Sequence, residues 1–196
     1  VWKTSKAKTM EDARQHEIPV AGTGSGSPSE GYPKLLNALA GTKFKIISGY
    51  RNTTEALNAV MYSLLTEFRD GDNVVTTWLE HNSNYVPWYA LTHEILPRLG
   101  RRVECRLARF DPATGRLDLD HLASLVDSRT KVVSCTGASN FLGTRTDLTA
   151  VRRIADASGY RQPNGERRSL LAVDAAQLMP SSCVDVRALD VDYLAF

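Results

Sequence analysis

The chain has 196 residues, of which 42% are hydrophobic and 23% charged, and its formal net charge is +2. This length suits one sizeable core, and scattered basic residues with balanced charge argue against a nucleic-acid-binding protein. Three cysteines without a Cys-x-x-Cys pair, four histidines without metal-ligand spacing and no apolar run of ~20 residues favour a reduced, cytoplasmic chain with neither a metal site nor a membrane span.

The first part of the chain differs from the rest in composition. Residues 1–31 are polar and are interrupted by "GTGSGSPSEG", which favours loop or disorder. We therefore expect a loop-rich lead-in over residues 1–42 and an ordered domain over residues 43–196.

Strands and helices are predicted to alternate from residue 43 onward. The expected strands are short apolar runs at 43–48, 73–78, 102–108, 131–135, 170–173 and 191–196. The expected helices have one apolar face or a capping signal, at 55–68, 85–96, 118–127 and 147–158. Pro87 is expected near the first turn of its helix, and Asp147 as the N-cap of the last one. The alternation predicts an α/β domain with a mainly parallel sheet flanked by helices.

Four polar loops follow four of these strands: "GYRNTT", "LEHNSN", "TGASN" and "VDAAQ". Ligands of parallel sheets bind beyond the carboxyl ends of the strands, so we expect these loops to converge on one edge. Six of their side chains could bind a ligand there: Thr53, Thr54, His81, Asn140, Asp174 and Gln177. Each also has a purely structural explanation as a cap, a turn residue or an exposed loop residue. Their shared edge is what favours a ligand.

The residue types indicate which chemistry this edge could carry. Thr53 and Thr54 precede a helix, whose free N–H groups and dipole attract an anion. His81 could stack on a flat ring or carry protons near neutral pH. Asp174 directly follows the buried strand expected at 170–173, and Gln177 comes three residues later. Two polar side chains at this strand end suit a cofactor with two polar atoms. They would equally suit a loop that caps the next turn.

The same motifs occur together in one known family. In order and spacing, "RNTTEALN", "GDNVVTTWLEHNSNYVPW", "GRLDLDHLASLVDSRTKVVSCTGASNFLGT", "AVDAAQ" and "VDVRALDVDYLAF" resemble the fold-type-I, class V aminotransferase superfamily. The closest branch is that of cysteine desulfurases and selenocysteine lyases. The resemblance covers about residues 43–196 and implies pyridoxal 5'-phosphate (PLP) as the cofactor.

The resemblance also implies a role for each of the six candidates. The two threonines would hold the cofactor phosphate, and His81 would stack on the pyridine ring and carry protons. Asp174 would pair with the ring nitrogen, which keeps it protonated because an opposite charge stabilises the charged form. Asn140 and Gln177 would donate hydrogen bonds to the phenolic oxygen of the ring.

Other functional residues of the family find no match in this chain. The Schiff-base lysine belongs to a Ser-x-His-Lys segment that follows the position of Phe196 in the family. The persulfide-forming cysteine and the carboxylate-binding arginine are also unmatched, and Cys105, Cys135 and Cys183 should not be given the cysteine's role. We therefore expect a fragment of an enzyme, or a chain whose site is completed by a C-terminal polypeptide, and a truncated, inactive relative is the third explanation.

The resemblance implies a cysteine desulfurase or C–S lyase that acts on a cysteine-like amino acid as a homodimer. Two alternatives stay open at this point. One is a class V aminotransferase or epimerase with a different substrate. The other is a non-catalytic or regulatory PLP-fold fragment that acts by assembly.

Overall fold

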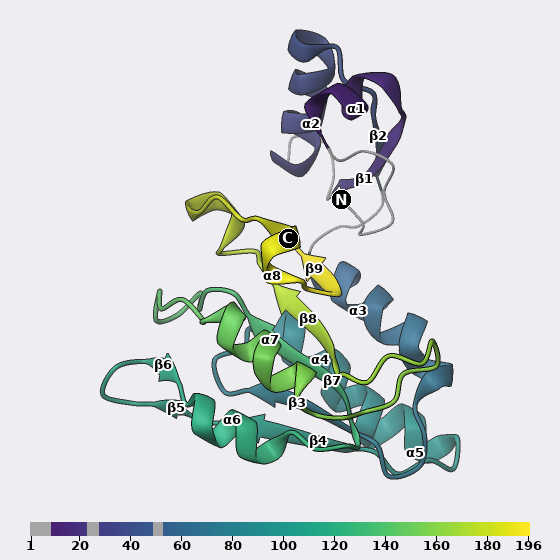
Figure 1. Ribbon diagram of the computed structural model, residues 1–196, viewed down its shortest axis with the longest axis vertical. Coiled ribbons are helices and arrows are strands. Elements are labelled where there is room, and N and C mark those ends of the chain that lie inside the picture. Colours follow the sequence, from purple (N-terminus) through teal and green to yellow (C-terminus); the bar gives the residue numbers. More distant parts are fainter. Residues whose placement is uncertain (1–8, 23–27, 49–52) are drawn as a thin grey trace. The chain divides into compact units, whose positions relative to one another are not determined.

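The computed structural model describes residues 9–22, 28–48 and 53–196 (Figure 1). The chain divides into two compact units, Val1–Glu55 and Ala56–Phe196. The larger unit holds the main sheet, and the division falls later in the chain than the boundary expected at residue 42.

The smaller unit contains regular structure where the sequence predicted a loop-rich lead-in. Its elements are α1 (Met10–Gln15), β1 (Ile18–Gly22), α2 (Pro28–Ala40) and β2 (Phe44–Ser48). Thr9 and Asp12 form a reciprocal capping box at the start of α1. The expected strand at 43–48 is confirmed, but it pairs in parallel with β1 and not with the main sheet. The loop-rich prediction was wrong over these elements because each strand supplies the other's backbone hydrogen bonds.

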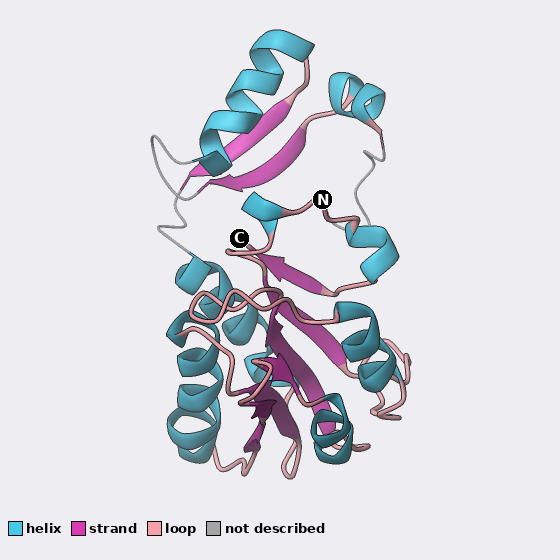
Figure 2. Cartoon of the chain, turned by 90° about the vertical axis from the view of Figure 1, so that its left-hand side faces the viewer, coloured by secondary structure: helices cyan, strands magenta, loops and turns pink. Residues whose placement is uncertain are grey.

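The larger unit is built on a five-stranded parallel sheet in the order β4-β3-β7-β8-β9. The strands are β3 (Asn73–Thr77), β4 (Glu104–Ala108), β7 (Thr130–Thr136), β8 (Leu170–Asp174) and β9 (Tyr193–Ala195). A separate antiparallel pair, β5 (Phe110–Asp111) and β6 (Arg116–Leu117), extends from the end of β4. Figure 2 shows the main sheet between layers of helices, which confirms the predicted α/β fold class.

Helices connect the strands of the larger unit. They are α3 (Thr53–Leu64), α4 (Asn82–Ala90), α5 (Leu96–Arg98), α6 (Leu119–Leu125), α7 (Leu148–Asp156) and α8 (Val186–Leu189), with short 3-10 turns at Leu65–Glu67 and Met179–Ser181. A π-helical turn, Leu91–Ile95, joins α4 to α5. The predicted N-cap Asp147 is confirmed, since it accepts a hydrogen bond from the backbone N–H of Ala150.

Helix α4 begins three residues earlier than the sequence predicted. His81 is its N-cap and accepts a hydrogen bond from the backbone N–H of Ser83. Residues 82–84 therefore belong to the first turn of the helix and not to the preceding loop. Pro87 consequently lies in the second turn, where the first-turn explanation for its missing N–H does not apply.

Consecutive strand residues face two different hydrophobic cores. Val75 and Val133 pack in a cluster that includes Val151 of α7. Their neighbours Val74 and Val132 pack in a second cluster with α3, α4 and α5. The period of two in a strand puts successive side chains on opposite faces. Every residue of β3 and β7 is buried, as expected for a sheet covered on both faces, although each strand also contains buried polar residues such as Thr76 and Ser134.

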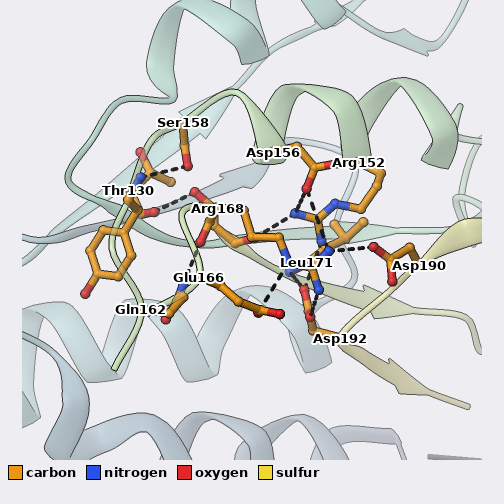
Figure 3. A network of polar contacts seen from close by, with 12 residues as sticks. Thr130, Arg152, Asp156, Ser158, Gln162, Glu166, Arg168, Leu171, Asp190 and Asp192 are labelled. Carbon is orange, nitrogen blue, oxygen red and sulfur yellow. Dashed lines mark hydrogen bonds and ion pairs between the residues drawn. The ribbon is translucent and has the colours of Figure 1, made fainter. Parts of the chain in front are cut away.

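Charged side chains join the start of β8 to the segment before β9 (Figure 3). We call this set the arginine network: Arg152, Asp156, Arg168, Asp190 and Asp192. Asp192 accepts from Arg152 at 2.9 Å, from Arg168 at 3.0 Å and from the backbone N–H of Leu171 at 2.8 Å. These bonds hold the beginning of β9 in parallel register against β8.

Candidate active site

Three of the four polar loops meet at the carboxyl ends of the central strands. The backbone N–H of Thr136, at the end of β7, donates to Glu80 in the loop after β3 at 2.9 Å. The N–H of Gly137 donates to the carbonyl of Asp174 at 2.8 Å. Gly137 also passes so close to Leu178 that a Cβ there would lie 2.8 Å from its side chain. Convergence is therefore confirmed for the loops after β3, β7 and β8.

The fourth loop, "GYRNTT", cannot be placed in the same way. Residues 49–52 lie outside the described residues. Thr53 and Thr54 form the first turn of α3 and are half-buried. Their helix-terminal position agrees with the expectation, and their phosphate-binding role stays a prediction.

Asp174 is a buried carboxylate without a cationic partner. It ends β8 and is 4% exposed. Its Oδ1 accepts from the backbone N–H of Ala176 at 3.0 Å, and its Oδ2 accepts from the hydroxyl of Ser83 at 3.2 Å. Within the described part of the chain, no ion pair to Asp174 is formed by a lysine, arginine or histidine. Burying a carboxylate is costly unless it is paired, so this position suits a ligand that brings a positive charge.

His81 is linked to Asp174 through one intervening side chain. Its Nδ1 lies 2.7 Å from the Ser83 hydroxyl, which in turn contacts Asp174. The imidazole is exposed at the N-terminus of α4. Sequence reasoning missed Ser83 because it placed the start of α4 at residue 85. The signal available was the histidine two residues before a serine at a helix start, a spacing that allows an N-cap contact.

Glu80 is a second carboxyl group at this edge, half-buried, and was also missed. It accepts from Thr77 Oγ1 at 2.6 Å, from Asn84 Nδ2 at 2.6 Å and from the Thr136 N–H. Burial raises the pKa of Glu80 to about 7, the negative charge of Asp174 raises it further, and the three hydrogen bonds oppose the rise. Its position directly after a strand, at the edge where ligands bind, was the signal that could have identified it.

Asn140 and Gln177 are exposed in the loops that follow β7 and β8. Gln177 lies three residues after Asp174, and Asn140 lies beyond the turn that begins at Gly137. Neither amide is hydrogen-bonded to the side chain of Asp174, His81 or Ser83 among the residues that the structure describes. Their proposed contacts with a cofactor oxygen stay predictions.

A cavity of about 610 Å³ lies near the opposite end of the strands and contains none of the six candidates. Two of its lining residues, Arg106 and Asp127, pair with each other at 2.7 Å. The other charged residues that line it, Arg102, Glu104 and Arg129, are exposed, so none of them is a buried charge like Asp174 at the carboxyl edge. We therefore place the candidate site at the carboxyl edge.

Neither a membrane-spanning helix nor a cluster of metal ligands occurs within residues 9–22, 28–48 and 53–196. No helix of these ranges is both long and apolar enough to cross a membrane. No three histidine, cysteine, aspartate or glutamate side chains of the same ranges gather as metal ligands.

A parallel sheet with a buried carboxylate and a capping histidine at its carboxyl edge places this chain among the α/β proteins, a class whose ligands bind beyond the strand ends. The chain belongs to the aminotransferase class-V family, whose model matches residues 34–196. The match confirms the resemblance read from the sequence and begins earlier than the expected start at residue 43. The smaller unit therefore contributes part of the matched region.

Curated and solved relatives support the same family. A cysteine desulfurase of Dickeya dadantii (strain 3937) is 39% identical over 149 residues, which are 74% of this chain and 32% of that protein. The solved cysteine desulfurase CsdA of Escherichia coli has a TM-score of 0.61 and 25% identity over 74% of this chain and 32% of its own. The apo cysteine desulfurase of Thermococcus onnurineus NA1 has the same TM-score and identity and covers 94% of this chain and 44% of its own. The chain thus spans about a third of the length of the curated relative.

Proposed function

We propose that this chain is the PLP-binding part of a cysteine desulfurase-like enzyme that acts on cysteine or a similar amino acid. One observation carries the proposal: Asp174 is a buried carboxylate at the ligand edge with no cationic partner among the described residues. The protonated pyridine nitrogen of PLP is a cationic N–H donor of the kind that this carboxylate lacks. Similarity to cysteine desulfurases supports the choice of substrate.

The donor and acceptor set of the site fits the cofactor. Each oxygen of Asp174 has one hydrogen-bond donor, and a carboxylate offers about four lone-pair sites, so acceptor capacity remains. His81 lies on the neighbouring element, linked through Ser83, and brings a flat ring that can stack. Backbone N–H groups at the start of α3 are suited to a phosphate.

Each residue has a distinct task in the proposed mechanism. When bound, PLP supplies an electron sink for the electrons released at the substrate Cα. Asp174 holds the proton on the ring nitrogen, because its charge favours the cationic form. His81 packs on the ring face and moves protons. The two threonines anchor the phosphate, and the amides of Asn140 and Gln177 orient the phenolic oxygen.

The test is made on the complete protein. We expect about one PLP per chain, measured by absorbance after alkaline release, together with sulfide release from L-cysteine. A protein that binds no PLP would overturn the proposal. Bound PLP without turnover would favour the non-catalytic alternative, and turnover of a sulfur-free amino acid would favour an aminotransferase or epimerase. Asp156→Asn, at a half-exposed position outside this site, serves as the matched control for Asp174→Asn.

We further propose that the protein works in the cytoplasm as a homodimer, which rests on the family resemblance and on the cysteine content. Light scattering on the complete protein should give twice the mass of one chain. A monomeric mass together with full activity would contradict this assembly.

A further inference from the structure

The carboxyl group of Glu80 joins three elements at the carboxyl edge of the sheet. Its Oε1 accepts from the hydroxyl of Thr77, the last residue of β3, at 2.6 Å and from the backbone N–H of Thr136, the last residue of β7, at 2.9 Å. Its Oε2 accepts from the side-chain amide of Asn84, in the first turn of α4, at 2.6 Å. Glu80 immediately precedes His81, so these contacts fix the loop residue next to the capping histidine.

The side-chain amide of Asn84 is itself fixed in orientation. Its Oδ1 accepts from Nε1 of Trp88 at 3.3 Å and from the hydroxyl of Ser134, in β7, at 2.7 Å. All three residues are fully buried. An indole N–H can only donate, so a rotated Asn84 amide would set its NH2 group against a second donor. The NH2 group of Asn84 therefore points toward Glu80 and needs an acceptor there.

The contacts of Glu80 continue through β7 to the strand that carries Asp174. Glu80 receives the N–H of Thr136, and the next N–H along the chain, that of Gly137, donates to the carbonyl of Asp174 at 2.8 Å. His81 follows β3 and Asp174 ends β8, and β7 lies between these two strands. The two bonds through β7 therefore help to set the separation of His81 and Asp174.

We propose that Glu80 is a positioning residue, which pairs with Asn84 to hold His81 in place relative to Asp174. The pair depends on a carboxylate at one position and an amide of fixed orientation at the other. At about pH 8 the Glu80 carboxyl lies above its pKa of about 7, so it is ionised and both oxygens accept. The inference rests on the proposed function only for what His81 does against a bound cofactor.

Two single substitutions break this pair in different ways. In Glu80→Gln, the amide oxygen has to stay with the donors Thr77 and Thr136, so the new NH2 group faces the NH2 group of Asn84. In Asn84→Asp, two carboxylates face each other. The double variant Glu80→Gln/Asn84→Asp restores one donor and one acceptor, because the amide and the carboxylate have exchanged positions. It also keeps the net charge of the wild type.

Solvent exchange of two matched backbone amides, measured by NMR on the cofactor-free complete protein at about pH 8, tests the proposal. The N–H of Tyr85 donates to the carbonyl of His81 at 3.1 Å, and the N–H of Val151 donates to the carbonyl of Asp147 at 3.0 Å. Each bond ends on the N-cap residue of its helix. We expect either single variant to speed exchange at Tyr85 about tenfold relative to Val151, and the double variant to restore the wild-type ratio.

Glu104→Gln, which removes a negative charge at an exposed position of β4, serves as the control and should leave the ratio unchanged. Faster exchange at both amides by the same factor would show only a loss of global stability and would overturn the proposal. So would a wild-type ratio in a folded single variant, or a double variant that exchanges like the singles. Where one single variant fails to fold, the other gives the same test.

The wild-type protein supplies a measurement that needs no variant. The side-chain NH2 group of Asn84 should exchange with solvent much more slowly than that of Asn82, which is exposed on the same helix. Equal rates for the two side chains would overturn the proposal. Absence of PLP binding would overturn the proposed function and leave all these exchange rates as they are, so the two failures are distinguishable.

Discussion

Two groups of carboxylates in the larger unit differ in the partners that meet their negative charge. In the arginine network, near the start of β8, Asp192 pairs with both Arg152 and Arg168. At the carboxyl edge, the described residues give Asp174 and Glu80 only hydroxyl, amide and backbone N–H donors. In the network, each negative charge is met by an arginine of the same unit. The carboxyl edge keeps negative charge that a cationic ligand group can meet, and this difference supports the site proposed there.

Removal of Asp192 should produce the largest effect, because it leaves two largely buried guanidinium groups without their shared partner. We expect Asp192→Ala to lower the free energy of unfolding by about 3–5 kcal/mol, measured by urea denaturation. Asp156, whose side chain is 46% exposed, provides the control, and Asp156→Ala should cost ~1 kcal/mol or less. Equal losses in the two variants would show that the network is no more than surface pairing.

Glu80 gives the carboxyl edge a pH dependence. Its pKa in the folded state is about 7, against an ordinary value of 4.5. Between these values the folded protein holds a proton that the unfolded chain has lost, so the free energy of unfolding falls as the pH rises. The contribution should decline by about 3 kcal/mol from pH 4.5 to pH 7. Glu80→Gln should flatten this part of the pH profile, and an unchanged slope would contradict the assignment.

Asp174→Asn tests whether the uncompensated charge serves a ligand. We expect activity of the complete enzyme to fall by about 10²-fold, or ~2.7 kcal/mol, because an amide no longer favours the protonated ring. The fold should persist, since no partner cation is left unpaired. Steady-state kinetics with PLP bound provide the measurement. Near-wild-type turnover would return Asp174 to a structural role.

His81→Ala should have the smallest effect on stability. Loss of the N-cap contact to Ser83 should cost about 0.5–1 kcal/mol. If His81 stacks on the cofactor, the absorbance of bound PLP should shift and the proton-transfer steps should slow. Stopped-flow absorbance measures both, and an unchanged spectrum with unchanged rates would leave His81 as a helix cap only.

The larger unit was predictable because its signals are local and agree with one another. Apolar runs such as 131–135 and the N-cap Asp147 fix the elements, and their alternation implies a parallel sheet. Convergence of three polar loops then follows from topology alone.

The failures arise where tertiary contacts override local signals. Gly31 and Pro33 are weak helix formers, yet both lie inside α2. Asn37 helps to hold this helix in place, because its amide bonds both the N–H and the carbonyl of Phe44 in β2 at 2.8 Å. The contact of Ser83 with Asp174 and that of Glu80 with Thr136 join residues far apart in the chain, so no local pattern could reveal these two contacts.

The position of β3 in the sheet has a consequence for synthesis of the protein. β3 (73–77) lies between β4 and β7, but β7 begins only at residue 130. Ribosomes add roughly 5–20 residues per second, so the edge of β3 that pairs with β7 stays unpaired for several seconds during synthesis. During this interval an apolar strand with unpaired N–H and carbonyl groups is open to other chains. Newly made protein should therefore depend on chaperones until β7 has emerged.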